Sequence, residues 1–174
     1  MVQKSDVQEY NRDYESFRAH YDDLAKIAAR EKRRMMNHIC VRVDDIDTAE
    51  MFLGDSFGIS NFIRLDGKLF KGEKKLSVAW VSEEMYLELM EPEQKQEIGY
   101  DTGCSHPIGH LSEVGYFIPD MDSELERLAG LGWEVIDAIE EPGRRMIKLD
   151  TEKPSGFPVE LIEIKFDEEE LKQG

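Results

Sequence analysis

The sequence of 174 residues contains few cysteines and no long apolar run. Its two cysteines, Cys40 and Cys104, lie in unlike contexts, and we interpret both as free thiols in a reducing cytoplasm rather than as a disulfide. No stretch approaches the ~20 apolar residues that a membrane-spanning helix needs. The first residues lack the apolar segment of a signal peptide, so we predict a cytoplasmic protein without a membrane partner.

Basic residues are also scarce, with 22 Lys and Arg against 38 Asp and Glu, and the formal net charge is −16. A negative field of this kind repels phosphates, which argues against nucleic acid and against an anionic membrane surface as partners. It does not exclude an anionic small substrate, because a local cation can outweigh the average field. The chain also lacks a phosphate-binding P-loop, a dinucleotide-binding glycine motif and a CxxC pair.

Hydrophobic residues make up 40% and charged residues 34%, which is typical of a soluble globular chain. Over residues 5–34, apolar residues recur at spacings of three and four and predict one helix. Its aromatic stripe must be buried, either against the domain or in a dimer. The basic residues at its end, Arg30 and 32–34, are either a solvated helix end or a site for an anionic substrate tail.

From residue 36 onward, the sequence predicts the order β-α-β-β-β twice, which makes the fold class α+β with two modules. We place a helical extension at 1–34, the first module at 35–92, a linker at 93–108, the second module at 109–166 and an acidic tail at 167–174. The strands are expected at 36–43, 61–66, 75–82, 85–92, 110–120, 133–140, 143–151 and 157–165, and the helices at 47–58 and 120–132.

The two modules align residue by residue. At an offset of 75, His38 falls on Glu113, and the two candidate helix caps, Asp45 and Asp47, fall on Asp120 and Asp122. At an offset of 72, Glu88 in the last strand of the first module falls on Glu160. The difference of three residues corresponds to an ordinary change in loop length.

This alignment selects four polar positions among apolar strand residues: His38, Glu88, Glu113 and Glu160. A carboxylate on a buried strand face is costly unless it is paired or bound to a metal. If the four side chains converge, a divalent cation would resolve their repulsion. Taken singly, His38 could be a structural histidine, and Glu88 or Glu160 could face water at a sheet edge.

Several motifs resemble those of the vicinal oxygen chelate superfamily, which includes glyoxalase I, methylmalonyl-CoA epimerase, extradiol dioxygenases and drug-resistance proteins. They are Asn37-His38-Ile39, LELMEP around Glu88, the strand SEVGYFIPDMD, and Glu160 in KPSGFPVELIEI. The resemblance covers residues 36–166. It implies a cleft between two modules and one divalent metal ion (Mn, Co, Fe(II), Mg, Ni or Zn) held by His38, Glu88, Glu113 and Glu160.

The third ligand position departs from the family pattern. Glyoxalase-like and epimerase-like members commonly carry His or Gln there, and this sequence has Glu113. His110 lies three residues earlier and would reach the same face only through a bulge. Because ring-cleaving dioxygenases use two histidines and one carboxylate, the single histidine in register makes an extradiol-type dioxygenase the third choice.

The resemblance implies an enzyme that acts on a small oxygenated substrate, as a glyoxalase-like lyase or an isomerase or epimerase. The metal would stabilise an enolate while Glu160 or Glu113 moves the proton at the carbon next to a carbonyl. The main alternative is a metal-free ligand-binding or drug-resistance protein of the same fold.

Three further residues are weaker candidates for contact with the substrate. Arg144 and Lys148 share one face of the strand at 143–151 and either bind a substrate carboxylate or face solvent. Trp80 either lines the pocket or belongs to the core. We also predict a homodimer, because the family often pairs modules and the aromatic helix needs a partner. The sequence leaves open whether the modules pair within one chain or across two.

Overall fold

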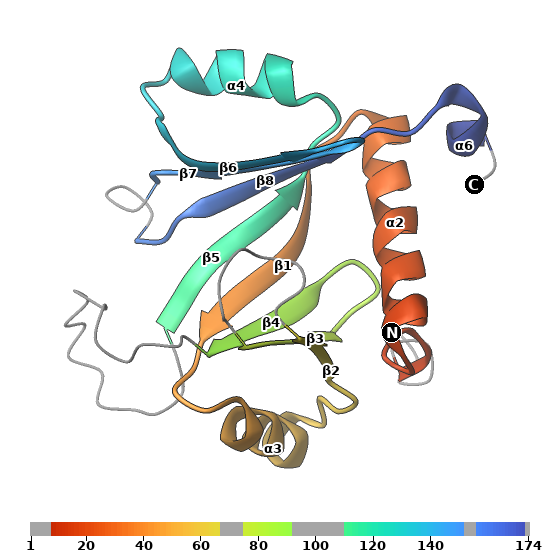
Figure 1. Ribbon diagram of the computed structural model, residues 1–174, viewed down its shortest axis with the longest axis vertical. Helices are drawn as coiled ribbons and strands as arrows, with labels where there is room; N and C mark the ends of the chain where they lie inside the picture. Colours follow the sequence, from red (N-terminus) through yellow and green to blue (C-terminus); the bar gives the residue numbers. More distant parts are fainter. Residues whose placement is uncertain (1–7, 67–74, 92–109, 152–155, 173–174) are drawn as a thin grey trace. The chain divides into compact units, whose positions relative to one another are not determined.

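The computed structural model describes residues 8–66, 75–91, 110–151 and 156–172, and its architecture is α+β, as predicted (Figure 1). Cys104 and the predicted linker at 93–108 lie outside these ranges. The chain forms two compact units, one of residues 1–16 and 39–112 and the other of residues 17–38 and 113–174. No helix in the described part of the chain is long and apolar enough to cross a membrane.

The helices and strands follow the predicted order closely. Their bounds are α2 (Tyr14–Glu31), β1 (Met35–Arg42), α3 (Ile46–Phe57), β2 (Ile63–Asp66), β3 (Lys75–Trp80), β4 (Tyr86–Glu91), β5 (His110–Phe117), α4 (Met121–Ala129), β6 (Val135–Glu141), β7 (Arg144–Leu149), β8 (Val159–Ile164) and α6 (Glu168–Lys172).

The first unit contains the strand order β2-β3-β4-β1, with β1 from Ile39 onward, and β2, β3 and β4 pair as antiparallel neighbours. Helix α3 begins at the Asp45 cap, whose side chain accepts a hydrogen bond from the backbone N of Thr48. The helix ends at Gly58, which has φ 70°, a conformation that favours glycine. Its inner face packs against the sheet in a cluster of Val43, Ile46, Ala49 and Leu89.

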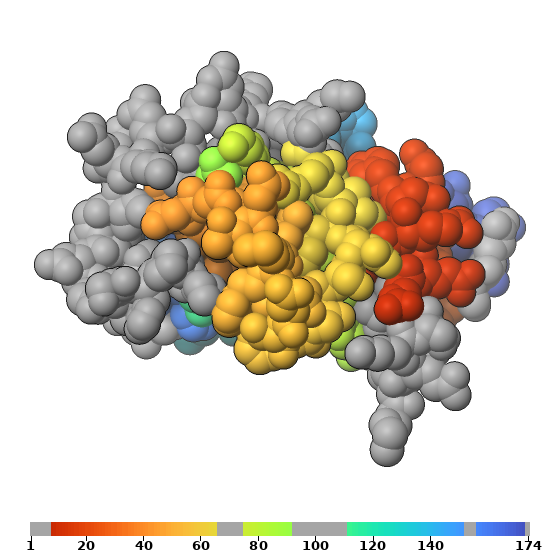
Figure 2. All heavy atoms as spheres, turned by 90° about the horizontal axis from the view of Figure 1, so that it is seen from below, coloured from red at the N-terminus to blue at the C-terminus, as the bar shows by residue number. Residues whose placement is uncertain are grey.

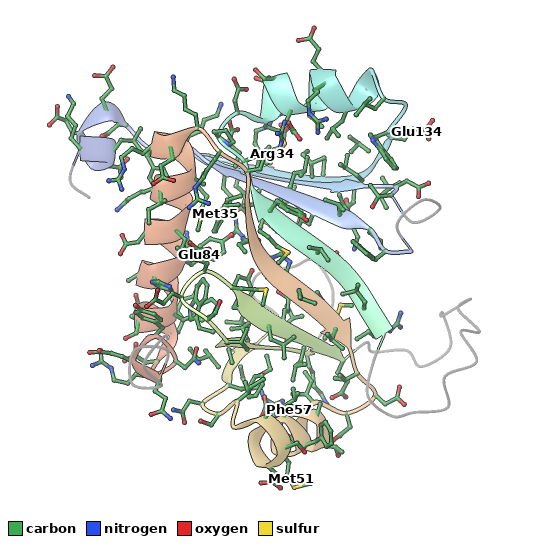
Figure 3. The ribbon with its side chains drawn as sticks, turned by 180° about the vertical axis from the view of Figure 1, so that it is seen from behind. Arg34, Met35, Met51, Phe57, Glu84 and Glu134 are labelled. Carbon is green, nitrogen blue, oxygen red and sulfur yellow. The ribbon has the colours of Figure 1, made fainter. Side chains whose placement is uncertain are left out.

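The outer face of α3 carries apolar side chains that remain exposed. Met51 and Phe57 are the clearest examples, and Figure 3 shows both beside this helix. Phe52 forms an edge-to-face contact with Phe57, with ring centroids 5.9 Å apart. Figure 2 shows the surface of the molecule on the side of α3, which is coloured orange to yellow.

The second unit contains the strand order β5-β8-β7-β6, with β5 parallel to β8 and the other neighbours antiparallel. Asp120 caps α4 by accepting from the backbone N of Ser123, as its counterpart Asp45 does for α3. One sheet face packs under α4 through a cluster that includes Ile147, Leu149 and Leu161. Because strand residues alternate, Glu113, Lys148 and Glu160 lie on the opposite face of their strands.

A repeated polar contact supports the duplication. In the first unit, Glu91 accepts a hydrogen bond from Ile46 N (3.2 Å) and pairs with Lys75 (2.7 Å) on the neighbouring strand. In the second unit, Glu163 accepts from Met121 N (3.1 Å) and lies 4.0 Å from Arg145. The hydrogen bonds repeat with the sequence offsets of 75 for the helix residue and 72 for the glutamate, and the cations are 70 residues apart. Each module therefore holds its helix to its last strand in the same way.

The single helix predicted for residues 5–34 is wrong, because residues 11–13 interrupt it and α2 begins at Tyr14. The side chain of Asn11 donates to the carbonyl O of Trp80 (3.0 Å) and accepts from its backbone N (2.8 Å). Asp13 then caps α2 by accepting from Ser16 N at 2.8 Å. A long-range hydrogen-bonding requirement thus overrides the local helical pattern.

Candidate metal centre

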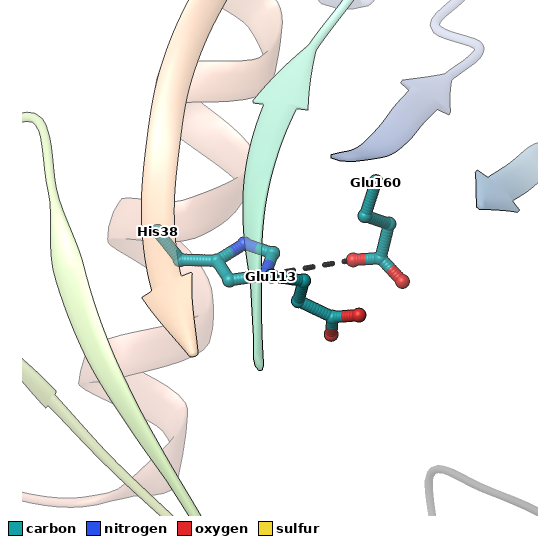
Figure 4. Close-up of side chains that lie close together, drawn as sticks. All are labelled: His38, Glu113 and Glu160. Atoms are coloured by element: carbon teal, nitrogen blue, oxygen red, sulfur yellow. Dashed lines mark ion pairs between the residues drawn. The ribbon is translucent and has the colours of Figure 1, made fainter. Parts of the chain in front are cut away.

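The second unit brings together three of the four predicted ligands. His38 comes from β1, Glu113 from β5 and Glu160 from β8 (Figure 4). One ligand atom of each lies within 4.8 Å of the others, and all three residues are buried. His38 Nε2 lies 3.6 Å from Glu160 Oε2. This spacing allows one cation to contact all three side chains.

The strand register explains how these side chains meet. In the parallel pair of β5 and β8, Gly115 is the partner of Glu160, and Glu113 precedes Gly115 by two residues on the same face. Gly115 leaves the space that the His38 ring occupies. A Cβ at this position would lie 2.0 Å from His38 Cε1 and 2.2 Å from Nδ1. A glycine is therefore required for the histidine to reach the two carboxylates.

Burial keeps the His38 imidazole neutral. The residue is 1% exposed, and burial lowers the pKa of His38 to about 4, with Glu113 raising it and Lys148 lowering it to a smaller extent. Nδ1 lies 3.1 Å from Asn37 Oδ1, which can only accept, so the ring proton resides on Nδ1. Nε2 then presents a lone pair, as a metal-binding imidazole does.

Lys148 supplies a positive charge beside these groups. It is the cross-strand partner of Glu160 in the antiparallel pair of β7 and β8. Its Nζ forms an ion pair with Glu113 Oε2. The sequence suggested Lys148 as a substrate-binding or solvent-facing residue and did not predict this pair. The alternation of strand residues indicates which face of β7 carries Lys148. That Glu113 is its partner follows only from the pairing of the strands in the sheet.

A family model described as the Glyoxalase/Bleomycin resistance protein/Dioxygenase superfamily matches residues 37–148. The chain belongs to this superfamily. The match includes His38, Glu88 and Glu113 and ends at Lys148. The predicted family is thus confirmed.

Several solved structures share the fold of this chain at low sequence identity. A methylmalonyl-CoA epimerase from Mycobacterium tuberculosis has 18% identity and a TM-score of 0.55, covering 76% of this chain and 89% of the epimerase. A hypothetical protein from Bacillus halodurans C-125 has 16% identity and a TM-score of 0.57, covering 77% and 96%.

A variant of the Streptomyces coelicolor methylmalonyl-CoA epimerase, in complex with 2-nitronate-propionyl-CoA, has 16% identity and a TM-score of 0.57. The similarity covers 75% of this chain and 94% of that enzyme. A search of curated proteins finds no match. At these identities the structural similarity establishes the superfamily fold.

The fourth predicted ligand, Glu88, belongs to the other unit. It lies on β4 opposite Val78 and is buried. Its participation in the metal site of this superfamily member stays a prediction. The side chain of His110, the residue considered as a substitute ligand, lies outside the described part of the chain.

The remaining candidates occupy two different environments. Trp80 is buried on β3, where it contacts Tyr86 edge to face with ring centroids 5.1 Å apart. Arg144 on β7 lies near Tyr21 of α2, with its guanidinium 5.9 Å from the ring centroid. Burial raises the pKa of Tyr21 to about 12, so its hydroxyl is protonated. Contact of Trp80 or Arg144 with a substrate stays a prediction.

The sequence did not predict that Tyr21 packs beside Phe117 and Arg144 in the second unit. The ring of Tyr21 meets Phe117 of β5 edge to face at 4.8 Å. Tyr21 belongs to the aromatic stripe of the predicted N-terminal helix. The stripe indicated that Tyr21 is buried, but not which surface of the protein it packs against. The structure assigns that surface to the β5 and β7 side of the second unit.

Proposed function

We propose that this protein is a divalent-metal-dependent isomerase, epimerase or lyase that moves a proton at a carbon next to a carbonyl. The observation that carries the proposal is the group of His38, Glu113 and Glu160, with ligand atoms within 4.8 Å of one another. Membership of the superfamily and the epimerase fold of its structural neighbours support it.

The side chains fit a divalent ion on chemical grounds. A neutral imidazole and two carboxylates suit Mn, Co, Fe(II), Mg, Ni or Zn, and we propose Glu88 as a fourth ligand. His38 Nε2 and Glu160 Oε2 lie 3.6 Å apart, and with the ring proton on Nδ1 both atoms are electron-pair donors. A cation bound by both atoms would offset their mutual repulsion. When bound, the ion would stabilise negative charge on a substrate oxygen.

Glu160 is our choice for the base that moves the proton. The other carboxylate, Glu113, pairs at Oε2 with the Lys148 ammonium in the metal-free protein, and we assign it the role of a metal ligand. His38 is neutral and held at Nδ1 by Asn37, so its role is to orient and bind. Burial of the group excludes water from the carbanion that proton removal creates.

The substrate we propose is a small carboxylic acid or its thioester. The structural neighbours include an epimerase in complex with methylmalonyl-CoA. In this chain Arg144 is the candidate for binding a substrate carboxylate, and Lys148 and Trp80 remain candidates for further contacts. Methylmalonyl-CoA is therefore the first compound to test.

Hydrogen–deuterium exchange at the substrate carbon tests the proposed chemistry. In D₂O, metal-loaded protein should exchange the α-hydrogen, as followed by NMR, and chelator treatment should stop the exchange. Glu160→Gln should slow it by about two to four orders of magnitude, because the substitution removes the base. Lys165→Gln, a change on the exposed side of the same unit, serves as a control. Full exchange by Glu160→Gln with metal bound would remove Glu160 from this role.

A metal-free ligand-binding protein is the second candidate, and the Lys148–Glu113 ion pair favours it. This pair supplies positive charge beside the carboxylates without a metal. Elemental analysis after purification without chelator separates the two functions, because the enzyme should carry about one metal ion per chain. A dioxygenase has no such support, since the assembled group includes one imidazole.

We retain a homodimer in the cytoplasm as a proposal about the assembled protein. Light scattering at several protein concentrations measures the mass directly, and twice the 20.1 kDa of the chain is the expected result. A mass equal to that of one chain would contradict the dimer and leave the proposed chemistry unaffected.

A further inference from the structure

Lys148 occupies an unusual position for a lysine, beside a group of side chains that suits a metal ion. Its Nζ pairs with Glu113 Oε2, and its strand neighbour is Glu160. One member of the candidate metal centre is therefore paired with an ammonium group of the protein itself, and another lies opposite the same lysine in the strand register. The inference developed below rests on the proposed function, because it concerns the same cation site.

The two modules differ at this position. In the first unit, the residue of β3 that faces Glu88 is Val78, which carries no charge. In the second unit, the residue of β7 that faces Glu160 is Lys148. The second module also has Glu113 where the first has His38. The extra carboxylate and the extra ammonium thus occur in the same module and contact each other.

A divalent ion bound at this centre would share the Glu113 carboxylate with the Lys148 ammonium. Glu113 and Glu160 carry two carboxylates, and Lys148 pairs its ammonium with the first of them. A divalent ion alone would balance the two carboxylates. With the ammonium still beside Glu113, the ion would experience repulsion from a like charge in a poorly solvated site.

The exposure of Lys148 gives its ammonium a way to leave. The Lys148 side chain is 31% exposed, whereas that of Glu113 is 12% exposed. A lysine has a flexible four-carbon stem and a strongly hydrated head group, so it can move its charge toward water while its backbone stays in the sheet. Glu113 has no comparable freedom, because its side chain is largely enclosed.

We propose that Lys148 is a built-in competitor for the metal. Its ammonium neutralises Glu113 when no metal is bound, and it leaves this carboxylate when a divalent ion binds. Lys148 is thus a positioning residue that sets the metal affinity of the centre. It stabilises the metal-free protein and weakens metal binding.

The test compares Mn²⁺ binding by chelator-treated wild type, Lys148→Met and Lys165→Met, measured by isothermal titration calorimetry. Lys148→Met removes the competing charge and keeps an unbranched side chain, so Mn²⁺ should bind at least about tenfold more tightly. Lys165→Met removes the same charge from an exposed position and should bind within about twofold of wild type. The His38→Ala variant measures Mn²⁺ binding to acidic residues outside the centre, and this contribution is subtracted from each titration.

The outcomes separate this inference from the proposed function. Equal Mn²⁺ affinity of wild type and Lys148→Met overturns the competition and leaves the metal-dependent enzyme standing. If only Lys148→Met binds Mn²⁺, the competition stands and metal dependence of the natural protein fails. If neither protein binds Mn²⁺, both proposals are overturned.

A second measurement on the wild type does not depend on the stability of a variant. The side-chain ammonium of Lys148 is followed by NMR in ¹⁵N-lysine-labelled protein during titration with diamagnetic Zn²⁺. Release from Glu113 should shift the Lys148 signal and speed the exchange of its protons with water. An unchanged signal at saturating Zn²⁺ overturns the proposal.

Discussion

The position of the His38 ring depends on the missing side chain of Gly115. The ring lies where a Cβ on β5 would be, at 2.0 Å from Cε1. Sequence comparison of the two modules identified His38 and Glu113 as equivalent positions, because their strands share a pattern and an offset. It did not identify Gly115 or the Lys148–Glu113 pair, since both depend on which strands become neighbours in the sheet.

Gly115→Ala should displace the His38 imidazole from the two carboxylates. We expect Mn²⁺ affinity to fall by at least about tenfold, because one of the three proposed ligands leaves. Calorimetry measures the affinity, and the ¹⁵N chemical shifts of the imidazole report its displacement. Gly130→Ala is the control, since its Cβ would have its nearest contact at 3.4 Å and its φ is −62°. Unchanged affinity in Gly115→Ala would show that the ring can bind from another position.

Glu124 links the start of α4 to the segment that follows α2. Hydrogen bonds from Arg127 and Arg34 hold the pKa of Glu124 at about 2, below its ordinary value of 4.5. Because the folded-state pKa is lowered, this group contributes stability at pH values above about 4.5 and loses it as the pH falls toward about 2. Both arginines are about half exposed, which reduces the contribution to about 1–2 kcal/mol.

Glu124→Gln should therefore lower the free energy of unfolding near neutral pH and have little effect near pH 2. Urea denaturation at a series of pH values measures this difference. Glu126→Gln, on an exposed position of the same helix, should leave the pH dependence as in wild type. A constant difference between Glu124→Gln and wild type at all pH values would contradict this linkage.

At the scale of the elements, capping residues made the short helices predictable. Asp45 and Asp120 precede α3 and α4, and both side chains accept the expected backbone hydrogen bonds. The break before α2 was not predictable from periodicity. It depends on Asn11, whose partner Trp80 is 69 residues away in the sequence. A local pattern contains no information about such a partner.

Asn11→Ala should destabilise the first unit by about 1–3 kcal/mol, because it removes two buried hydrogen bonds to the Trp80 backbone. Chemical denaturation measures the loss, and tryptophan fluorescence follows the environment of Trp80. Arg12→Ala, at an exposed neighbouring residue, is expected to change stability by less than about 0.5 kcal/mol. Equal effects of the two substitutions would show that the Asn11 contacts contribute nothing specific.

At the scale of the whole molecule, the sequence predicted the duplication and the order of every strand in the described part of the chain. The paired contacts of Glu91 and Glu163 show that the two copies also share a way of holding their helices. These glutamates follow Glu88 and Glu160 by three residues and so lie on the opposite strand faces. The last strand of each module therefore contacts the helix with one carboxylate and carries a second carboxylate on its opposite face.

Glu91→Ala and Glu163→Ala should each weaken the attachment of one helix. Loss of the hydrogen bond to the helix N-terminus and of the cross-strand cation contact should cost about 1–3 kcal/mol. Amide hydrogen exchange should show faster exchange in α3 for Glu91→Ala and in α4 for Glu163→Ala. Faster exchange in both helices with either substitution would contradict separate attachment.

The close approach of the His38 ring to Gly115 also bears on how such a protein changes over evolution. A glycine codon becomes an alanine codon by one base change, and the added methyl group would collide with the His38 ring rather than with the backbone of the sheet. A single mutation could thus disable the imidazole while the surrounding architecture persists. On this scaffold, one base change therefore suffices to displace a proposed metal ligand.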